Sequence, residues 1–500
     1  MRMKDPAASI VPVIPIDRHS GRPLTRQVYD GFRSAILRGD LRPGQRVPSS
    51  RQLAAELLIS RFPLLDAYAQ LVAEGYFETR AGSGTFVSQS MPDRVPNRVS
   101  EPKHADARSP GSRLLARRSF LFPQFEQLPW RYGWGAFGVH QPAFDQFPFD
   151  IWSKLVARHS REPRLHAMHH VDPLGLEPFR HAICEYLRTA RAVHCDPGQI
   201  MIVSGSQQAL DITVRVLLDV GDRVWLEEPG YTLTRAVLAG SGCDLVPVPV
   251  DQEGMDVAAG IHRAGDARAV FVTPSHQYPL GSTMSVSRRL QLLDWAQKSG
   301  AWIVEDDYDS EYRYDSLPIP SLQGLDTDSR VIYVGTFSKV LFASLRLGYI
   351  VIPPDLVERF LAVRFAMDIF PSYLYQEVMT GFMGDGHFGR HIRRTRALYS
   401  DRRSQLVSGI REHFGEELKI HGDQAGMHVT VSLQGGHHDV EVATRAAKER
   451  LWLWPLSKSY WSTEPLQGFI LGFGSTPTAY IPQYLSQLRT LLHPPGSGQV

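Results

Sequence analysis

Apolar residues recur at helical spacing three times within the first 75 positions of the chain. A first helix is predicted over residues 24–37, where the apolar side chains share one face. A second helix is predicted to begin after Ser49, because Ser49 and Gln52 have the spacing of a capping box. Leucines follow at helical spacing as far as Leu58, and a third helix carries an apolar stripe over residues 64–72. Three short helices in succession predict a small helical domain.

The segment YFETRAGSGTFV, residues 76–87, is typical of two short strands joined by a tight turn. Helices followed by such a hairpin predict a winged helix-turn-helix domain over residues 20–88. A small helical cap packed on the rest of the chain is the alternative. Residues 89–120 hold few large apolar side chains and many Pro, Ser and Arg, a composition that predicts a flexible basic linker.

Beyond the linker, strand-like apolar runs alternate with helical patterns. The runs are QIMIVSG, RVWLEEP, AVFVTP, AWIVEDD and VIYVG. This alternation predicts an α/β fold with a parallel sheet covered by helices. Residues 121–500 are expected to form this body, with a large lobe over about 175–370 and a smaller α+β lobe over about 371–500.

The net charge of +2 is unevenly distributed along the chain. Residues 1–120 carry 19 Lys+Arg and 11 Asp+Glu, whereas the remainder carries 35 and 41. A basic front on an acidic body indicates that only the front meets a polyanion. The three cysteines form no CxxC pair, and no apolar run approaches the ~20 residues of a membrane span. We therefore expect a reduced, cytoplasmic protein without a membrane partner.

Polar residues follow three of the predicted strands, at the edge where open α/β sheets bind ligands. The turn SGSQQAL, residues 204–210, would present backbone N–H groups at a helix N-terminus, which suits a phosphate. EDDYD, residues 305–309, could bind a protonated ring nitrogen and an oxyanion. Lys339 could form a Schiff base with a carbonyl, and Arg346 could grip a phosphate. The alternatives are a plain turn, a metal-binding or solvated acidic cluster, and a solvated lysine.

Taken together, these pieces resemble the fold-type I, aspartate-aminotransferase-like enzymes that use pyridoxal 5′-phosphate (PLP). The resemblance rests on SGSQQAL, EEPGY, TPSHQYPLG, EDDYDSEYRY, GTFSK and a following arginine. With PSSRQLAAELLISR and GYFETRAGSGTFV ahead of them, the chain resembles the MocR subfamily of GntR-type regulators over about residues 20–490. The resemblance implies a multidomain protein, a winged helix-turn-helix joined to a PLP-dependent transferase-like domain, that forms a head-to-tail homodimer.

The resemblance also implies a role for each matched residue. Lys339 would hold PLP through a Schiff base, and Asp306 would pair with the pyridine nitrogen. Tyr308, helped by Gln277 or His276, would bond the ring hydroxyl oxygen. The other residues expected against the ring or the phosphate are Tyr231, which would stack on the ring, and Ser206, Gln207, Thr336 and Arg346, which would hold the phosphate.

Two departures from the family pattern affect the ligand site. The usual GYGDPAG segment, whose tyrosine reaches the partner subunit's phosphate, is HHVDPLG here, so His170 takes the tyrosine's place. The late segment FILGFG has Ile470 where related transaminases carry an arginine for the substrate α-carboxylate. Arg235 is a candidate substitute for binding the effector, with an exposed helix arginine as the alternative. The histidines at 166–170 lack an H-E-x-x-H arrangement, so no metal is expected.

The recognition helix of the front domain also departs from the usual pattern. It reads SRFPLLDAY, in which Phe62, Pro63 and Asp66 replace residues that commonly make polar contacts. Asp66 would repel phosphates or accept a hydrogen bond from cytosine. The residues expected to contact double-stranded DNA are Arg51, Ser60, Arg61, Arg80, Gly82 and Gly84; ordinary exposure at the surface is their alternative interpretation.

The leading hypothesis is therefore a PLP-dependent transcriptional regulator. It would bind an operator and sense PLP, a small amine or an amino acid through Lys339, with little or no steady transamination. The competing hypothesis is an active aminotransferase with an appended winged-helix domain. The intact set of Lys339, Asp306 and Tyr308 favours the enzyme, whereas Ile470 and the DNA-binding pattern favour the regulator.

Overall fold

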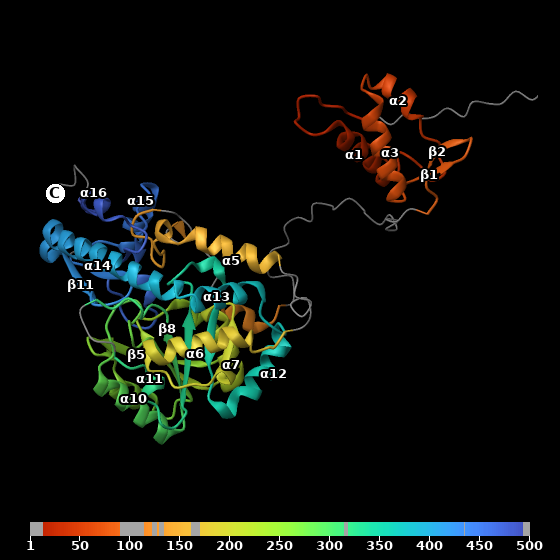
Figure 1. Cartoon of the computed structure of the whole chain (residues 1–500). Helices are drawn as coiled ribbons and strands as arrows, with labels where there is room; N and C mark the ends of the chain where they lie inside the picture. Colours follow the sequence, from red (N-terminus) through yellow and green to blue (C-terminus); the bar gives the residue numbers. More distant parts are fainter. Residues whose placement is uncertain are drawn as a thin grey trace, which may run out of the picture. The chain divides into compact units, whose positions relative to one another are not determined.

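The computed structural model describes residues 14–90, 115–122, 128–129, 135–161, 171–314, 319–434 and 436–493. The chain divides between Leu114 and Leu115 into two compact units (Figure 1). Within these described ranges, no helix has the length and apolar character needed to cross a membrane.

The first unit is a three-helix domain with a two-stranded hairpin (Figure 1). Its elements are α1 (Leu24–Leu37), α2 (Ser50–Glu56), α3 (Arg61–Ala73), β1 (Phe77–Arg80) and β2 (Gly84–Val87). The rings of Phe32, Tyr68 and Phe77 meet edge to face at centroid distances of 5.3 Å, which joins α1, α3 and the hairpin into one core. The predicted winged helix-turn-helix is confirmed.

Three details of the predicted helices are wrong. Ser49 accepts a hydrogen bond from the backbone N–H of Gln52 (3.2 Å), but the Gln52 side chain donates to Glu56, so only half of the capping box forms. Helix α2 ends at Glu56, and Leu58 lies beyond it in the left-handed region (φ 53°) with 78% of its surface exposed. The apolar stripe of α3 is narrower than expected because Leu65 is exposed.

The second unit is built on an eight-stranded mixed sheet. In spatial order its strands are β3 (Ile200–Val203), β10 (Gly348–Val351), β9 (Val331–Thr336), β8 (Trp302–Asp307), β7 (Ala269–Val272), β4 (Arg223–Glu228), β5 (Asp244–Asp251) and β6 (Gly254–Met255). Strands β9, β8, β7, β4 and β5 run parallel, as predicted. Strand β10 is antiparallel to both of its neighbours, and the sequence hid it because all four of its residues are buried.

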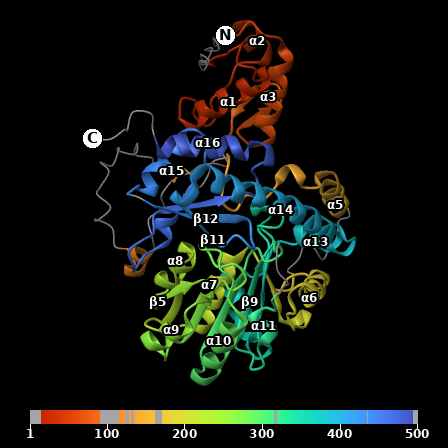
Figure 2. The same ribbon diagram turned by 90° about the vertical axis from the view of Figure 1, so that its left-hand side faces the viewer.

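Helices cover both faces of this sheet (Figures 1 and 2). They are α6 (Glu177–Arg191), α7 (Ser206–Leu217), α8 (Thr232–Gly240), α9 (Val257–Ala264), α10 (Val286–Ser299), α11 (Leu322–Leu325), α12 (Val357–Met367) and α13 (Leu374–Gly384). Successive strand residues point to opposite faces. Val224 and Leu226 of β4 pack into the core on one face of the sheet. Trp225, between them, packs into the core on the other face, where its ring stacks on Trp295 of α10 at a centroid distance of 3.8 Å.

A smaller lobe contains a four-stranded antiparallel sheet, and Figure 2 shows α14 beside its strands β11 and β12. Its elements are β11 (Leu418–His421), β12 (His428–Leu433), β14 (Gly468–Gly472), β13 (Trp454–Pro455), α14 (His387–Phe414), α15 (Asp439–Lys448) and α16 (Ile481–Leu492). Its core also includes Ala136, Phe137 and Ala143, which come from much earlier in the chain. The small lobe therefore draws on residues outside the 371–500 range expected from sequence.

Two segments precede the sheet of the second unit. Helix α5 (Phe149–Arg161) packs against α13. A short 3-10 helix, Arg117–Leu121, contacts α8, and the ring of Phe122 lies against Gly240. The described part of this unit therefore includes residues 115–120, which were predicted as part of the linker.

Candidate functional site

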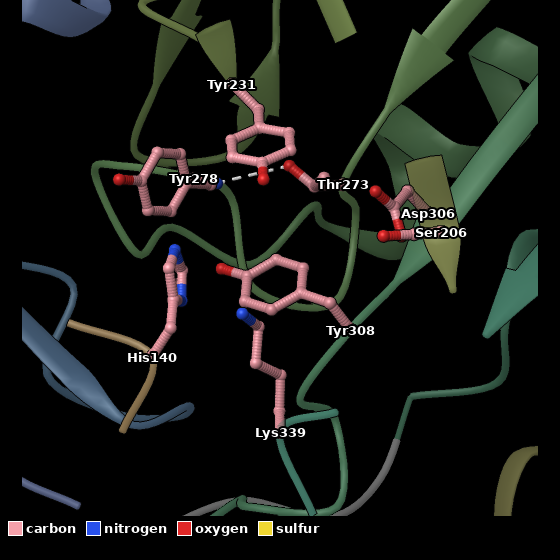
Figure 3. A pocket seen from close by; sticks show the side chains of 8 residues that line it. All are labelled: His140, Ser206, Tyr231, Thr273, Tyr278, Asp306, Tyr308 and Lys339. Atoms are coloured by element: carbon pink, nitrogen blue, oxygen red, sulfur yellow. Dashed lines mark hydrogen bonds between the residues drawn. The ribbon is translucent and has the colours of Figure 1, made fainter. Parts of the chain in front are cut away.

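A pocket in the second unit lies at the carboxyl ends of the central strands, where the sequence predicted it (Figure 3). Its described lining residues are His140, Ser206, Tyr231, Thr273, Tyr278, Asp306, Tyr308 and Lys339. Five of these eight were predicted as site residues. The structure therefore brings together side chains that lie more than 130 positions apart in the chain.

Lys339 follows β9 and points its amine into the pocket toward Tyr308 (Figure 3). Burial lowers the pKa of Lys339 to about 8, against the opposing influence of Asp309 and Asp306. A larger share of its amine is therefore neutral near physiological pH than in a solvated lysine. A neutral, buried amine is the form that attacks a carbonyl.

Asp306 is the penultimate residue of β8, the parallel strand beside β9, and carries an unsatisfied oxygen. Its Oδ1 is buried and has no hydrogen-bond partner among the residues that the structure describes. Burial and the neighbouring Asp307 raise the pKa of Asp306 to about 7, although Lys339 opposes the shift. An orphaned buried carboxylate calls for a cationic N–H donor, and the protonated pyridine nitrogen of PLP is one.

The phenol of Tyr308 is held by the loop after β7. Its Oη donates to the carbonyl oxygen of His276 (2.9 Å) and lies 3.1 Å from Nδ1 of the same residue. That Nδ1 lies 3.1 Å from both carboxylate oxygens of Asp309. Of the two expected helpers of Tyr308, His276 is therefore the one beside it.

Gln277 has a different role from the one expected. Its Nε2 donates to the backbone oxygens of Pro229 (2.9 Å) and Tyr278 (2.7 Å), and its Oε1 accepts from the N–H of Leu280 (3.0 Å). The amide is thus used to fix the turn, because each of its polar atoms has a backbone partner. The next residue, Tyr278, lines the pocket instead.

Groups that could form a phosphate cradle lie at the N-terminus of α7. Gly205 precedes the helix with φ 116°, and Ser206 is its first residue. A Cβ atom on Gly205 would lie 3.2 Å from the guanidinium of Arg346, so the arginine closes directly over this turn. Thr336 is buried at the end of β9, where its Oγ1 accepts from the N–H of Ser338 (3.2 Å). Helix N–H groups, hydroxyls and a guanidinium together suit a phosphate.

The two remaining residues expected to hold the phosphate are Gln207 and His170. Gln207 donates through Nε2 to the carbonyl oxygen of Leu233 (3.2 Å) in α8, and it does not line the pocket. His170 lies outside the described residues.

Aromatic rings form the wall opposite Lys339. Tyr231 meets Tyr278 edge to face at 5.5 Å, and His140 lies 5.3 Å from Tyr278 (Figure 3). Sequence reasoning missed His140, Thr273 and Tyr278. His140 belongs to a segment that has no periodic pattern and packs with the small lobe. Tyr278 could have been predicted, because it lies within the motif TPSHQYPLG.

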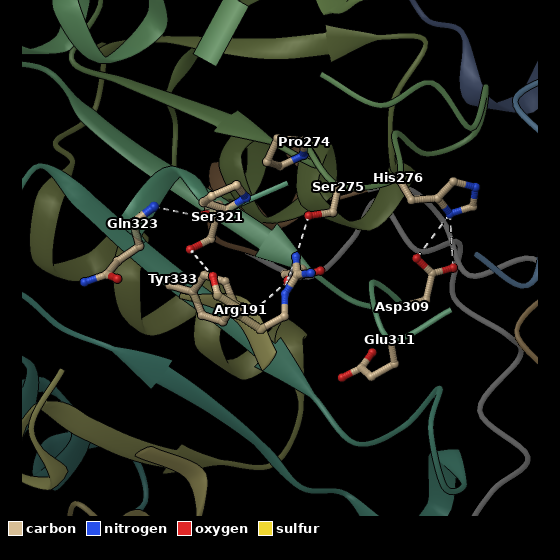
Figure 4. Close-up of polar contacts among 12 residues, drawn as sticks. Arg191, Pro274, Ser275, His276, Asp309, Glu311, Ser321, Gln323 and Tyr333 are labelled. Atoms are coloured by element: carbon tan, nitrogen blue, oxygen red, sulfur yellow. Dashed lines mark hydrogen bonds and ion pairs between the residues drawn. The ribbon is translucent and has the colours of Figure 1, made fainter. Parts of the chain in front are cut away.

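A second polar network lies behind Asp306, on the other face of β8. Arg191 donates from Nε to Asp307 Oδ2 (2.8 Å) and from a terminal nitrogen to Ser275 Oγ (2.8 Å), and Tyr333 donates to the same carboxylate (2.5 Å) (Figure 4). The pair Arg191–Asp307 is almost fully buried. The two adjacent aspartates of β8 therefore differ, since one is ion-paired and the other faces the pocket.

Neither of the two positions considered for a ligand carboxylate places a charge in the pocket. Ile470 of β14 is fully buried and packs with Tyr278 and Tyr308. The Arg235 guanidinium lies 5.8 Å from the ring of Trp461, outside the described pocket lining. Burial lowers the pKa of Arg235, and Glu228 nearby opposes that shift.

Among the described residues, His276, Asp309 and His428 form a group whose ligating atoms all lie within 4.8 Å of one another. Each has a partner within the protein, since His276 meets Asp309 and His428 Nε2 lies 3.3 Å from the carbonyl oxygen of Pro279. We interpret the group as a hydrogen-bonded support for Tyr308.

The DNA-contact residues expected in the first unit lie in α2, at the start of α3 and in the hairpin. Arg51 and Ser60 are exposed, and Arg61 donates from Nε to Ser50 Oγ (3.1 Å). Arg80 is held by Glu78 (3.0 Å) and lies 4.6 Å from the ring of Phe86. Two glycines of the wing, Gly82 (φ 72°) and Gly84 (φ 110°), adopt conformations that favour glycine.

Comparison with known proteins assigns both units. Residues 24–87 match the model of bacterial regulatory proteins of the gntR family, and residues 142–457 match aminotransferase class I and II. The chain is 39% identical to the probable rhizopine catabolism regulatory protein MocR of Rhizobium meliloti, over 95% of each chain. It is 30% identical to the pyridoxine biosynthesis transcriptional regulator PdxR of Corynebacterium glutamicum, over 92% of this chain and 94% of that one.

Solved structures agree with this assignment. The kynurenine aminotransferase of Pyrococcus horikoshii superposes with a TM-score of 0.70 and 25% identity, covering 77% of this chain and 98% of that one. The fold-type I prediction is confirmed, and an aminotransferase domain of this class implies PLP binding just as the gntR unit implies DNA binding. The chain is therefore a member of the MocR subfamily of GntR-type transcriptional regulators, in which a winged helix-turn-helix domain is joined to an aminotransferase-like domain.

Proposed function

We propose that this protein is a DNA-binding regulator that senses PLP or a small amine through a Schiff base on Lys339. The observation that carries the proposal is the pairing, in one pocket, of a buried amine of lowered pKa with the orphaned carboxylate of Asp306. The gntR unit at the front of the same chain supplies the DNA-binding half.

Each pocket residue has a task toward the cofactor in this proposal. PLP, when bound, supplies an aldehyde that exchanges amines and a ring that withdraws electrons. Lys339 would hold the aldehyde carbon, Asp306 would keep the ring nitrogen protonated, and Tyr308 would donate to the ring hydroxyl oxygen in place of the His276 carbonyl. Tyr231 would cover one face of the ring.

The cradle at α7 would hold the phosphate. Ser206 contributes its hydroxyl and backbone N–H, Thr336 a hydroxyl and Arg346 a bidentate charge-assisted contact. His170 would add a donor from a second subunit in a head-to-tail homodimer, as the related tyrosine does in the family. These contacts would form a tight phosphate anchor that stays in place while the amine at the aldehyde end changes.

The exposed face of α3 would read the operator. Phe62 (75% exposed), Leu65 (46%) and Asp66 lie at positions i, i+3 and i+4 of this helix. Apolar side chains contact thymine methyl groups in the major groove, and an aspartate accepts from cytosine N4. Arg51, Ser60 and Arg61, with wing residues Arg80, Gly82 and Gly84, would contact the phosphate backbone. We propose an operator rich in thymine opposite α3.

Two measurements on the full chain test the proposal. The visible absorption band of a Lys339–PLP Schiff base should appear on adding PLP and be absent in Lys339→Ala. Binding to the upstream DNA of its own gene should fall steeply with salt and exceed binding to a scrambled duplex. Absence of the band would contradict PLP sensing through Lys339. Equal binding to the two duplexes would contradict specific DNA binding.

The intact set of Lys339, Asp306 and Tyr308 also favours a second candidate, an active aminotransferase. Turnover of an amino donor with a 2-oxo acid acceptor, lost in Lys339→Ala, would establish it. Binding of an amine that shifts the band without producing a 2-oxo product supports the regulator instead.

A further inference from the structure

A second cleft in this unit lies between the large lobe, which holds the eight-stranded sheet, and the small lobe. Its described lining comes from the ends of β4 and β5, the loop after β7, strand β11 with the loop after it, and the segment before β14. The two backbones meet beside it, since a Cβ atom on Gly281 would lie 2.5 Å from the carbonyl oxygen of Gly422. The space inside it, open solvent included, is about 1480 Å³. None of its described lining residues lines the pocket of Lys339, so the two sites are separate.

Glu228, the last residue of β4, lines this cleft and is 4% exposed. Its Oε1 accepts from the backbone N–H groups of Trp461 (3.0 Å), Ser462 (2.9 Å) and Thr463 (3.2 Å). Its Oε2 is buried and has no hydrogen-bond partner in the described part of the chain. The carboxylate is therefore fixed in place through one oxygen while the other lacks a donor, which is costly for a buried charge.

The hydroxyl of Ser282, in the loop after β7, is a second polar group of this cleft without a partner. Its Oγ is buried and makes no hydrogen bond to the residues that the structure describes. Arg235 interacts electrostatically with Glu228, but its guanidinium lies 5.8 Å from the ring of Trp461 and donates no hydrogen bond to Glu228 Oε2. Two buried acceptors in one cleft are thus left for a donor from outside the described chain.

The other carboxylates of the cleft have cations beside them. Asp251 pairs with Arg288 (3.0 Å), and Asp423 lies 3.9 Å from Arg411. Lys419, which also lines the cleft, is exposed to solvent. Among the described lining residues, Glu228 is therefore the carboxylate that makes no ion pair, and it is also the buried one.

Apolar and aromatic surface surrounds the two acceptors. The side chains that provide it are those of Pro229, Leu280, Ile420, Tyr460 and Leu466. Burial and the nearby Glu228 raise the pKa of Tyr460 to about 12, so this phenol is uncharged near neutral pH. A guanidinium has five N–H donors in one plane, so it can serve a carboxylate oxygen and a hydroxyl at once and stack on an aromatic ring. An aliphatic chain attached to it would cover the apolar side chains.

We propose that the cleft between the lobes is a second ligand site, which binds an alkylguanidinium through Glu228 Oε2 and Ser282 Oγ. This site goes beyond the proposed function, because it needs neither PLP nor Lys339. A protonated guanidinium is also no nucleophile toward the aldehyde of PLP, so binding here and binding at Lys339 can be measured apart.

The first test compares two probes of the same shape. The full chain is titrated with butylguanidinium and with its uncharged analogue butylurea, and isothermal titration calorimetry gives a Kd for each. We expect butylguanidinium to bind at least about tenfold more tightly, because its hydrogen bonds to the carboxylate are charge-assisted. Equal affinities, or no binding of butylguanidinium, overturn the proposal.

Three variants locate the bound probe. Glu228→Gln keeps the shape and a carbonyl oxygen for the backbone N–H groups but removes the charge, so butylguanidinium should bind at least about tenfold more weakly. Ser282→Ala removes the hydroxyl and should weaken binding by about three- to tenfold. Glu253→Gln is the matched control, an exposed glutamate outside the described lining, and it should leave the Kd unchanged. Wild-type affinity in both Glu228→Gln and Ser282→Ala overturns the proposal.

The titration is run with and without PLP, and the visible band of the PLP-loaded protein is recorded for each variant. We expect the band to be the same in all of them, since none of the three positions lines the Lys339 pocket. If Glu228→Gln fails to fold or loses the band, Ser282→Ala and the butylurea comparison decide. Absence of the band in the wild type contradicts PLP sensing alone, whereas the calorimetric result still decides this second site.

Discussion

The guanidinium of Arg346 lies 3.2 Å from the position that a Cβ atom on Gly205 would occupy. A side chain at 205 would therefore displace the arginine from the N-terminus of α7. Gly205→Ala should weaken PLP binding by roughly 10- to 100-fold, because it would remove the proposed bidentate phosphate contact of Arg346 and strain a residue with φ 116°. Equilibrium titration of the visible band measures the change.

Gly221→Ala is the matched control for this variant. Gly221 also has a positive φ (89°), but no atom lies within 4 Å of its Cβ position. Both substitutions should lower stability by a similar ~1–2 kcal/mol, while only Gly205→Ala should lower PLP affinity. Equal PLP affinities for the two variants would remove Arg346 and Gly205 from the phosphate site.

The lowered pKa of Lys339 predicts a pH-dependent rate of PLP attachment. The neutral amine is the nucleophile, so the rate should rise about tenfold per pH unit below the pKa and level off above about pH 8. An ordinary lysine would keep rising toward pH 10. Stopped-flow absorbance between pH 6 and 10 measures this profile, with Lys298→Ala, an exposed lysine, as a control that leaves it unchanged.

Asp306→Asn should separate stability from cofactor binding. The pKa of Asp306 in the folded protein, about 7, lies above the ordinary value of an aspartate. Between about pH 4 and 7 the carboxyl is therefore protonated in the folded protein and ionised in the unfolded chain. This group therefore stabilises the cofactor-free protein at low pH and loses that contribution as pH rises through 7. The asparagine cannot ionise, so at pH 8 the cofactor-free variant should be more stable than wild type by a few kcal/mol, since each tenfold difference in proton affinity corresponds to about 1.4 kcal/mol.

The same variant should bind PLP more weakly, because a neutral amide cannot keep the ring nitrogen protonated. Urea unfolding at pH 5 and pH 8, without PLP, measures the stability change, and titration of the visible band measures affinity. Asp244→Asn, at an exposed position of β5, should change neither. A destabilised Asp306→Asn protein at pH 8 would contradict the raised pKa.

Part of this site could be predicted because parallel strands bring their carboxyl ends together. Asp306 and Lys339 each follow an apolar run in the sequence, and the structure places them at the ends of the adjacent strands β8 and β9. His140 could not be predicted this way. It reaches the pocket from a non-periodic segment that packs with the small lobe, a contact that depends on tertiary packing alone.

The same distinction explains the error at Gln277. A sequence motif identifies the residues of a turn but not the direction of each side chain. The hydrogen bonds of Gln277 to the backbone oxygens of Pro229 and Tyr278 turn its amide away from the pocket, and Tyr278 lines the pocket instead. Those bonds involve a strand end 48 residues earlier, which local pattern does not encode.

The exposed apolar side chains of α3 predict that DNA binding depends on the methyl groups of thymines in the operator. An operator is first obtained by selection from random duplexes, and each thymine is then replaced by deoxyuridine. Replacement opposite Phe62 should cost about 1–3 kcal/mol of binding in the wild type and little in Phe62→Ala. Leu37→Ala, which trims an exposed apolar residue of α1, should keep the wild-type sensitivity. Additive losses from the two changes would show that Phe62 does not contact the methyl group.

The two adjacent aspartates of β8 make this strand unusually intolerant of changes in length. Asp306 faces the pocket, while Asp307 is paired with Arg191 and Tyr333 on the opposite face. Because the side chains of a strand alternate, inserting or deleting one residue ahead of them would exchange their environments. Protein engineers who recombine segments of such regulators to change what they sense should therefore place no junction within Trp302–Asp307.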